Sequence, residues 1–219
     1  MYIILDKNLK RVATLDMASE DNLFWGETIQ SQLADDNSSN DSITEAGFAS
    51  STDPNANSKS WNETLSGLTM LADSPAAQYL KVGNHLAVYD QTNDRWRVYR
   101  IYTVDETMDT TSGTNLVSVE ATNLLIWRLG KTIPTKKELK ECNLDQALEW
   151  LLADTGVTLI NNATSGLLTD FSMDGSSTSQ TLLQTILTTY DCEADGYVTL
   201  DSSGLVSDIV LELSDQRGQ

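Results

Sequence analysis

The chain has 219 residues, 40% of them hydrophobic and 21% charged, with 32 Asp and Glu against 14 Lys and Arg. This length and composition allow a substantial hydrophobic core, which excludes a globally disordered protein. The formal net charge of −18 repels phosphates, so nucleic-acid binding is not expected. No apolar run approaches the roughly 18 residues that a membrane helix requires, and the strand-like Tyr2–Leu5 stands where a basic signal region would begin. We therefore expect synthesis in the cytoplasm and no membrane insertion.

The chain is expected to open with a hairpin and then a long loop. Tyr2–Leu5 and Arg11–Leu15 flank a polar turn at residues 6–8, and apolar runs around such a turn predict two paired strands. The segment Ala34–Ser60 is crowded with Ser, Asn, Asp and Ala. A segment of this composition cannot bury enough apolar surface to order itself, so a mobile surface loop is expected there.

Further strands are expected after the loop. Apolar residues return at 61–71 in a pattern compatible with a strand. The clearest hairpin joins His85–Tyr89 to Arg95–Val104 across four consecutive turn formers at 91–94. Another strand is expected at 115–121. The first half of the chain is therefore predicted to consist of strands.

The hydrophobic period changes from two to 3.6 after Asn143, which predicts helices. The apolar stripe of the first helix consists of Leu144, Ala147, Leu148, Leu151 and Leu152. Asn143 and Gln146 fit a capping pattern at its start, and Gly156 can end it. A second helix is expected to begin near Ser177 and to end before a turn at Asp195–Gly196.

The chain is expected to close with a hairpin that joins 197–200 to 206–213. The change from strands to a mixture of helices and strands places a domain boundary near Gly130, between domains at 1–129 and 130–219. The sequence therefore predicts an α+β protein that is mainly β, whose smaller second domain contains two helices.

Residues suited to catalysis are scarce. His85 is the only imidazole, and we interpret it as structural or exposed and not as the base of a nucleophile system. The acids of Asp105–Asp109 are expected to decorate a solvated turn. Cys142 and Cys192 are too few for a disulfide framework and are expected to pack in the core. No calcium-loop, Walker or dinucleotide motif occurs, so no catalytic, cofactor-binding or metal-binding residue is predicted.

One stretch combines basic and aromatic residues, namely Arg95, Trp96, Arg97, Tyr99, Arg100 and Tyr102. Because side chains alternate along a strand, Arg95 and Arg97 share one face and Arg100 points to the other. A platform for nucleic acid is one interpretation, since aromatic rings stack on bases. Cross-strand pairing with acids such as Glu120, together with core packing, is the favoured alternative.

An assembly interface is expected on the strands His85–Tyr89 and Arg95–Tyr102, because edge strands and exposed aromatic residues commonly form interfaces. The residues predicted to contribute are His85, Val88, Tyr89, Arg95, Arg97, Tyr99 and Tyr102.

Several segments, taken together and in their order along the chain, resemble those of a known protein family. These segments are Met1–Asp6, Leu80–Tyr89, Arg95–Val104, Val117–Leu125, Asn143–Leu148, Thr155–Gly156, Asp208–Leu211 and Asp215–Gly218. Their succession resembles the N-terminal part of phage tail-tip hub proteins, the tail-associated lysin or prophage endopeptidase tail family. The resemblance covers nearly the whole chain, and Ala34–Ser60 departs from it by being longer and less structured.

The resemblance implies a β-barrel-like first domain followed by an α+β domain, similar to the baseplate hub of contractile-tailed phages. It implies a virion structural protein at the tail tip that forms a homotrimer and contacts the distal tail protein and the tape measure protein. Such a hub closes the tail tube, supports receptor-binding or lytic modules, and lets DNA pass without specific binding. Any peptidase or glycosidase would lie beyond Gln219, so a non-enzymatic fragment made in a bacterial host cytoplasm is expected.

Two alternatives remain open. A carbohydrate- or receptor-binding module could use an exposed Trp25, Trp61 or Trp96 to stack on sugar rings, although burial of at least two of them is favoured. The chain could also be a fragment of a cell-wall hydrolase.

Overall fold

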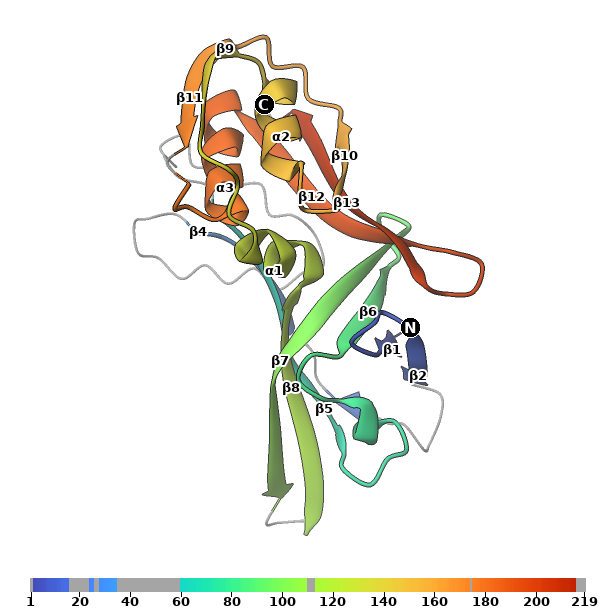
Figure 1. The fold of residues 1–219 in the computed structure, drawn as a ribbon. Helices are drawn as coiled ribbons and strands as arrows, with labels where there is room; N and C mark the ends of the chain where they lie inside the picture. Colours follow the sequence, from blue (N-terminus) through green and yellow to red (C-terminus); the bar gives the residue numbers. More distant parts are fainter. Residues whose placement is uncertain are drawn as a thin grey trace.

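The computed structural model describes residues 2–15, 24–25, 28–34, 60–109, 113–173 and 175–215. The described chain is mainly β with three α-helices, which confirms the predicted fold class (Figure 1). Most of the loop expected at Ala34–Ser60 lies outside the described residues, and its two end residues belong to strands.

A single sheet of eleven strands organises the molecule. Its strands are β1 (Tyr2–Leu5), β2 (Arg11–Leu15), β3 (Phe24–Trp25), β4 (Thr28–Ala34), β5 (Ser60–Leu71), β6 (His85–Asp90), β7 (Arg95–Asp109), β8 (Thr114–Asn123), β10 (Thr158–Asn161), β12 (Cys192–Leu200) and β13 (Val206–Asp215). The main path runs β10-β13-β12-β7-β6-β1-β2, and β8 joins β7 to β5. The sheet curls into a half-barrel, and β7 is the strand on which its branches meet.

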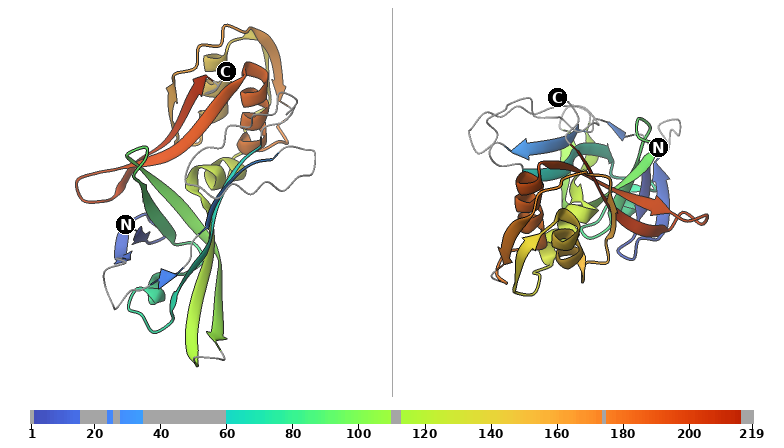
Figure 2. Two further views of the ribbon diagram at one scale, coloured as in Figure 1. Left: turned by 180° about the vertical axis from the view of Figure 1, so that it is seen from behind. Right: turned by 90° about the horizontal axis from the view of Figure 1, so that it is seen from above.

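The remaining elements are a two-stranded sheet and the helices. These elements are β9 (Lys137–Cys142), β11 (Thr169–Met173), the 3-10 helix η2 (Ala77–Tyr79), α1 (Leu124–Lys131), α2 (Leu144–Leu152) and α3 (Ser179–Tyr190). Helices α2 and α3 lie at one end of the molecule, the β7–β8 hairpin projects from the other end, and α1 lies between them (Figures 1 and 2). No helix in the described part of the chain is long and apolar enough to cross a membrane.

Both hairpins expected in the first half are confirmed. In the opening hairpin, the Asp6 carboxylate accepts hydrogen bonds from the backbone N–H groups of Asn8 (2.8 Å) and Lys10 (2.9 Å). In the β6–β7 hairpin, the Asp90 carboxylate accepts from the N–H of Thr92 at 3.0 Å. An aspartate that binds the backbone two residues ahead stabilises a turn. The first turn therefore forms for the reason that the sequence suggested, whereas the second is stabilised by Asp90, which precedes the predicted turn formers at 91–94.

Two hydrophobic clusters lie on opposite faces of the first strands. Ile4 and Leu86 point into the half-barrel, where they pack with a cluster drawn from residues 2–121. Their neighbours Ile3 and Ala87 point the other way, into a cluster that includes the helices. Alternation along a strand produces this division. The second cluster joins residues from both halves of the chain, and the boundary near Gly130 stays a prediction.

The first predicted helix is confirmed as α2. The Asn143 side chain accepts from the N–H of Gln146 at 2.9 Å, and Gln146 accepts from the N–H of Asn143 at 3.1 Å, which completes a capping box. An additional helix, α1, was not predicted. Its N-cap is Asn123, whose side chain accepts from the N–H of Leu125 at 2.9 Å.

Two details of the second half differ from expectation. Helix α3 is capped by Thr178 and not by Ser177, because the Thr178 hydroxyl accepts from the N–H of Thr181. The expected turn at Asp195–Gly196 is wrong, since both residues lie inside β12 and pair with β13. The chain reverses earlier, at Asp191, whose φ of 53° ends α3 in the left-handed region.

Candidate functional site

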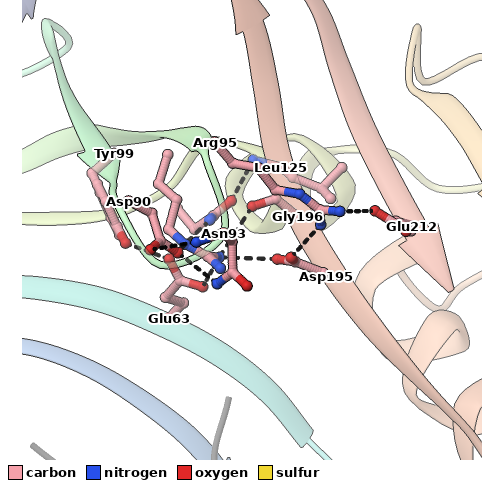
Figure 3. Close-up of polar contacts among 11 residues, drawn as sticks. Glu63, Asp90, Asn93, Arg95, Tyr99, Leu125, Asp195, Gly196 and Glu212 are labelled. Carbon is pink, nitrogen blue, oxygen red and sulfur yellow. Dashed lines mark hydrogen bonds and ion pairs between the residues drawn. The ribbon is translucent and has the colours of Figure 1, made fainter. Parts of the chain in front are cut away.

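A cluster of buried charged side chains lies where the two halves of the chain meet (Figure 3). We call it the Arg97 cluster, and its members are Glu63 on β5, Asp90 on β6, Arg95, Arg97 and Tyr99 on β7, Asn123 at the end of β8, Asp195 on β12 and Glu212 on β13. Charged side chains are seldom buried unless they are paired, so this concentration identifies a candidate site.

Arg97 lies at the centre of the cluster with a side chain that is only 7% exposed. Its Nε lies 3.2 Å from Asp90 Oδ2, and its Nη1 lies 3.3 Å from Glu63 Oε2 and 3.0 Å from Asp195 Oδ1. Nη1 also donates to the carbonyl of Gly196 at 3.4 Å. One guanidinium therefore contacts β5, β6 and β12.

Glu63 links the cluster to helix α1. Tyr99 donates its hydroxyl proton to Glu63 Oε1, and the Asn123 amide donates to the same oxygen at 3.2 Å. The other end of the Asn123 side chain caps α1. A shift of Glu63 would therefore be transmitted to the start of the first helix.

Arg95 completes the connection to the last hairpin. Asp195 and Glu212 are directly paired across β12 and β13, which would place two negative charges side by side. Arg95 separates these charges, with Nη1 2.8 Å from Asp195 and Nη2 2.7 Å from Glu212. Its guanidinium also stacks over the Tyr197 ring at 4.3 Å from the centroid.

Burial shifts the titration of several members. It raises the pKa of Glu63, against the opposing attraction of Arg97. Burial and the charge of Glu63 together raise the pKa of Tyr99. Burial alone would raise the pKa of Asp90, but hydrogen bonds from Asn93 and the charge of Arg97 outweigh it and lower that pKa. Four carboxyl groups share two guanidinium groups here.

The chemistry of the Arg97 cluster is that of a structural joint. It contains no imidazole or thiol, and its Tyr99 hydroxyl is buried and donates to the buried Glu63 carboxyl group. Within the described ranges, no group of three or more His, Cys, Asp and Glu side chains is placed to hold a metal ion. The cluster can hold the helical end of the molecule against the half-barrel.

The predicted interface residues fall into two groups. His85, Val88, Arg97 and Tyr99 are buried, whereas Tyr89 and Arg95 are half-buried and Tyr102 is 45% exposed. The expectation that His85–Tyr89 is an edge strand is wrong, because β6 pairs with β1 on one side and β7 on the other. The interface itself stays a prediction.

His85 was expected to be either structural or exposed, and the structure shows that it is a buried structural residue. Its Nδ1 donates to the backbone carbonyl of Asp6 at 3.1 Å. Burial, together with the positive charges of Arg100 and Arg128, lowers the pKa of His85, while its contact with Asp6 opposes the shift. The imidazole thus connects the opening hairpin to β6 in its neutral form.

The alternation of the basic-aromatic stretch is confirmed. Arg95 and Arg97 join the same cluster, while Arg100 stacks on Trp127 at 4.3 Å on the other face. Acids do pair with Arg95 and Arg97, but Glu120 is not among them. Glu120 lies beside Tyr102 instead, and its charge contributes to a raised pKa of that tyrosine.

Two other expectations concern packing. Cys142 and Cys192 are both buried, as predicted. Trp96 is partly buried against the helix-containing core, and its ring lies 5.2 Å from that of Tyr89. The side chains of Trp25 and Trp61 lie outside the described residues.

Little in the sequence indicates the acidic members of the cluster. Glu63, Asp90 and Asp195 are separated from Arg97 by 34, 7 and 98 residues, so only the folded chain brings them together. The single available hint was an acid or arginine inside an otherwise apolar strand, as at Glu63 and Arg97, since such a residue needs a buried partner.

Comparisons with solved structures concern the fold. The prophage tail protein gp18 from Listeria monocytogenes EGD-e is 10% identical, and the match has a TM-score of 0.50 over 98% of this chain and 50% of that one. A 43 kDa tail protein of prophage MuSo2 from Shewanella oneidensis is 16% identical, with a TM-score of 0.46 over 84% of this chain and 48% of that one. An E. coli component of the type VI secretion system, c3393, is 11% identical, with a TM-score of 0.46 over 71% of this chain and 42% of that one.

No protein-family model matches the sequence, and no curated protein matches it. The chain spans about half the length of the Listeria tail protein. The match to the Listeria prophage tail protein agrees with the resemblance to phage tail proteins seen in the sequence. The chain has the fold of a prophage tail protein.

Proposed function

We propose that the protein is a structural part of a phage tail, in the hub at the tail tip or baseplate. The observation that carries the proposal is the fold, which the chain shares along 98% of its length with a prophage tail protein. In this role it forms a homotrimer, closes the tail tube, and supports receptor-binding or lytic modules. The distal tail protein and the tape measure protein are its proposed neighbours.

The Arg97 cluster supports a role in transmitting force between the parts of a hub. A hub transmits force between a tube and a tip, so its parts must keep their relative orientation. Arg97 and Arg95 tie residues of the half-barrel to Asp195 and Glu212 on the last two strands. Ion pairs between buried groups are directional, unlike hydrophobic contacts, and therefore favour one arrangement of the two halves.

The charge of the chain supports passage of DNA. A net charge of −18 makes the protein repel phosphates. A channel wall that repels phosphates does not retain a moving genome, whereas a basic wall would hold it. The proposed hub therefore lets DNA pass without binding it specifically.

The exposed members of the predicted interface remain its proposed contact residues. Tyr102 is 45% exposed, and Tyr89 and Arg95 keep part of their surface accessible. Aromatic and arginine side chains are enriched in protein interfaces. The buried residues His85, Val88, Arg97 and Tyr99 would act only by holding these strands in place.

Deleting the gene from the phage or prophage that encodes the protein tests the proposal. A hub protein is required for tail assembly, so electron microscopy of the deletion should show heads without normal tails, and the wild-type gene supplied in trans should restore them. Complete tails that fail to adsorb would instead indicate a receptor-binding module. Complete, adsorbing virions that fail to penetrate the cell wall would indicate a hydrolase.

A further inference from the structure

The outer half of β7 is an open sheet edge. Pairing between β6 and β7 ends at His85 and Arg100, and Ile101 makes the last backbone hydrogen bonds on that side, with Gly83 and Asn84, each at 2.9 Å. From Tyr102 to Asp109 the described chain gives β7 a partner on one side alone, which is β8. The hairpin projects away from the helices (Figures 1 and 2).

This edge carries acidic side chains but neither Lys nor Pro. Natural edge strands are commonly blocked by charged side chains, above all Lys, by Pro or by an irregular register. Residues 102–109 include Asp105, Glu106 and Asp109, which repel an acidic strand and attract a basic one. The register shift in the β7–β8 pair lies at the base of the hairpin, between Ile101 and Thr103, and pairing is regular from there to Asp109. Among the described residues, nothing pairs with the backbone N–H and C=O groups that face away from β8, and such groups can accept an added strand.

One face of the hairpin is hollowed and combines apolar with polar side chains. A cavity of about 630 Å³ is lined by Val104 and Glu106 of β7, by Val117 of β8, and by residues between 72 and 82 that include both Val82 and Lys81. Val82, which lines it, is 63% exposed, and Met108 on the same face as Val104 is 64% exposed. An apolar side chain from an added strand would enter this hollow.

The opposite face of the hairpin is acidic. Thr103 pairs with Glu120 and Asp105 pairs with Ser118, so the two acids share the face turned away from the hollow. Both acids are exposed. No Lys or Arg occurs in 102–109 or 114–120 to neutralise them. The acidic face therefore favours basic side chains on the same side of an added strand.

We infer that the open edge of β7 at Tyr102–Asp109 binds an extended segment of a partner protein in which apolar and basic residues alternate. Added as a strand, the segment pairs its backbone with β7 and places apolar side chains over the hollow beside Val104 and Met108. Its Lys or Arg side chains lie beside Asp105, on the face that also carries Glu120 one strand further on. The alternation of apolar and basic residues in the segment matches the alternation of the two faces along β7, because side chains alternate with a period of two in every strand. This docking role does not depend on a place in a tail.

A synthetic nine-residue peptide of alternating Lys and Val, with blocked ends, is the probe. Hydrogen exchange of the full chain should show slowed exchange of backbone amides within 102–109 when the peptide is added. A second peptide carries Glu at each Lys position, and a third carries methyl groups on alternate backbone nitrogens. Each should bind at least about tenfold more weakly than the first, because several exposed charge pairs or the backbone pairing are lost.

Matched variants of the protein separate a local site from general attraction between opposite charges. The pair of substitutions Asp105→Lys and Glu120→Lys should weaken binding of the Lys–Val peptide about tenfold. Glu149→Lys with Asp154→Lys changes the net charge equally at exposed positions on and after α2 and should leave binding unchanged. Equal weakening by both pairs, equal binding of the methylated peptide, protection of amides elsewhere, or no binding would each overturn the inference.

Discussion

Arg97 and Glu63 form an ion pair inside the protein, with 3.3 Å between Nη1 and Oε2 and side chains that are 7% and 3% exposed. The two residues lie on β7 and β5, which are not neighbours in the sheet. Arg97 also binds Asp195, 98 residues along the chain. The Arg97–Glu63 pair therefore links two strands that do not pair with each other directly.

Removing the central cation should destabilise the fold strongly. Arg97→Met leaves Glu63, Asp90 and Asp195 buried without their common partner, and we expect a loss of about 3 to 5 kcal/mol in the free energy of unfolding. Urea denaturation measures this loss. The matched control is Lys140→Met, which breaks the ion pair with Asp170 between side chains that are 73% and 58% exposed, and it should leave the unfolding midpoint unchanged. Equal midpoints for the two variants would show that the Arg97 cluster contributes nothing.

The pH dependence of stability should carry a signature of Glu63. Burial raises its pKa in the folded protein above the value of 4.5 expected in the unfolded chain. Its contribution to stability is therefore fully present below pH 4.5 and is lost as the pH rises through the folded pKa. Glu63→Gln removes this dependence, so the stability of the variant relative to wild type should increase from pH 4 to pH 8. A constant difference across that range, measured by urea denaturation, would contradict the raised pKa.

Much of the architecture follows from local sequence patterns. The opening hairpin, the β6–β7 hairpin and α2 form where Asp6, Asp90 and Asn143 provide the turn or cap that the patterns predict. Helix α1 escaped prediction because its cap, Asn123, ends a strand and the helix begins with no intervening turn. The central position of β6 in the sheet could not be predicted, because β1 pairs with it across about eighty residues of chain. No local pattern encodes a contact over that separation.

The candidate site was predictable only in part. The shared face of Arg95 and Arg97 follows from strand alternation, and the structure confirms it. The identity of their acidic partners depends on how β5, β12 and β13 are brought together. Glu120 pairs with Thr103 in the hairpin, and long-range contacts placed other acids beside the arginines.

His85 should titrate below its ordinary pKa of 6.5, because its burial and the positive charges of Arg100 and Arg128 outweigh the opposing contact with the carbonyl of Asp6. Stability contributed by its neutral form is fully present above pH 6.5 and is lost as the pH falls through the folded pKa. As the only histidine in the chain, it gives one imidazole resonance, which NMR can follow from pH 8 to pH 5. A midpoint at or above 6.5 would contradict the buried, neutral assignment.

Acidic residues that line the proposed channel should speed the passage of DNA. Two exposed groups can be reversed separately, Asp105 with Glu106 on β7 and Glu149 with Asp154 near α2. If one group faces the channel, its reversal to Lys should slow genome ejection, because lysines there would hold phosphates. Ejection triggered in vitro and followed by the fluorescence of a DNA-binding dye gives the rate. Unchanged rates for both reversals would argue against these acids lining a conduit.

The central claim is a structural place at the end of a phage tail, and immunogold labelling of purified virions tests it most directly. Antibodies raised against the folded chain should place gold particles at the tail end distal to the head. Absence of the protein from purified virions, or labelling spread along the tail tube or over the head, would contradict the account.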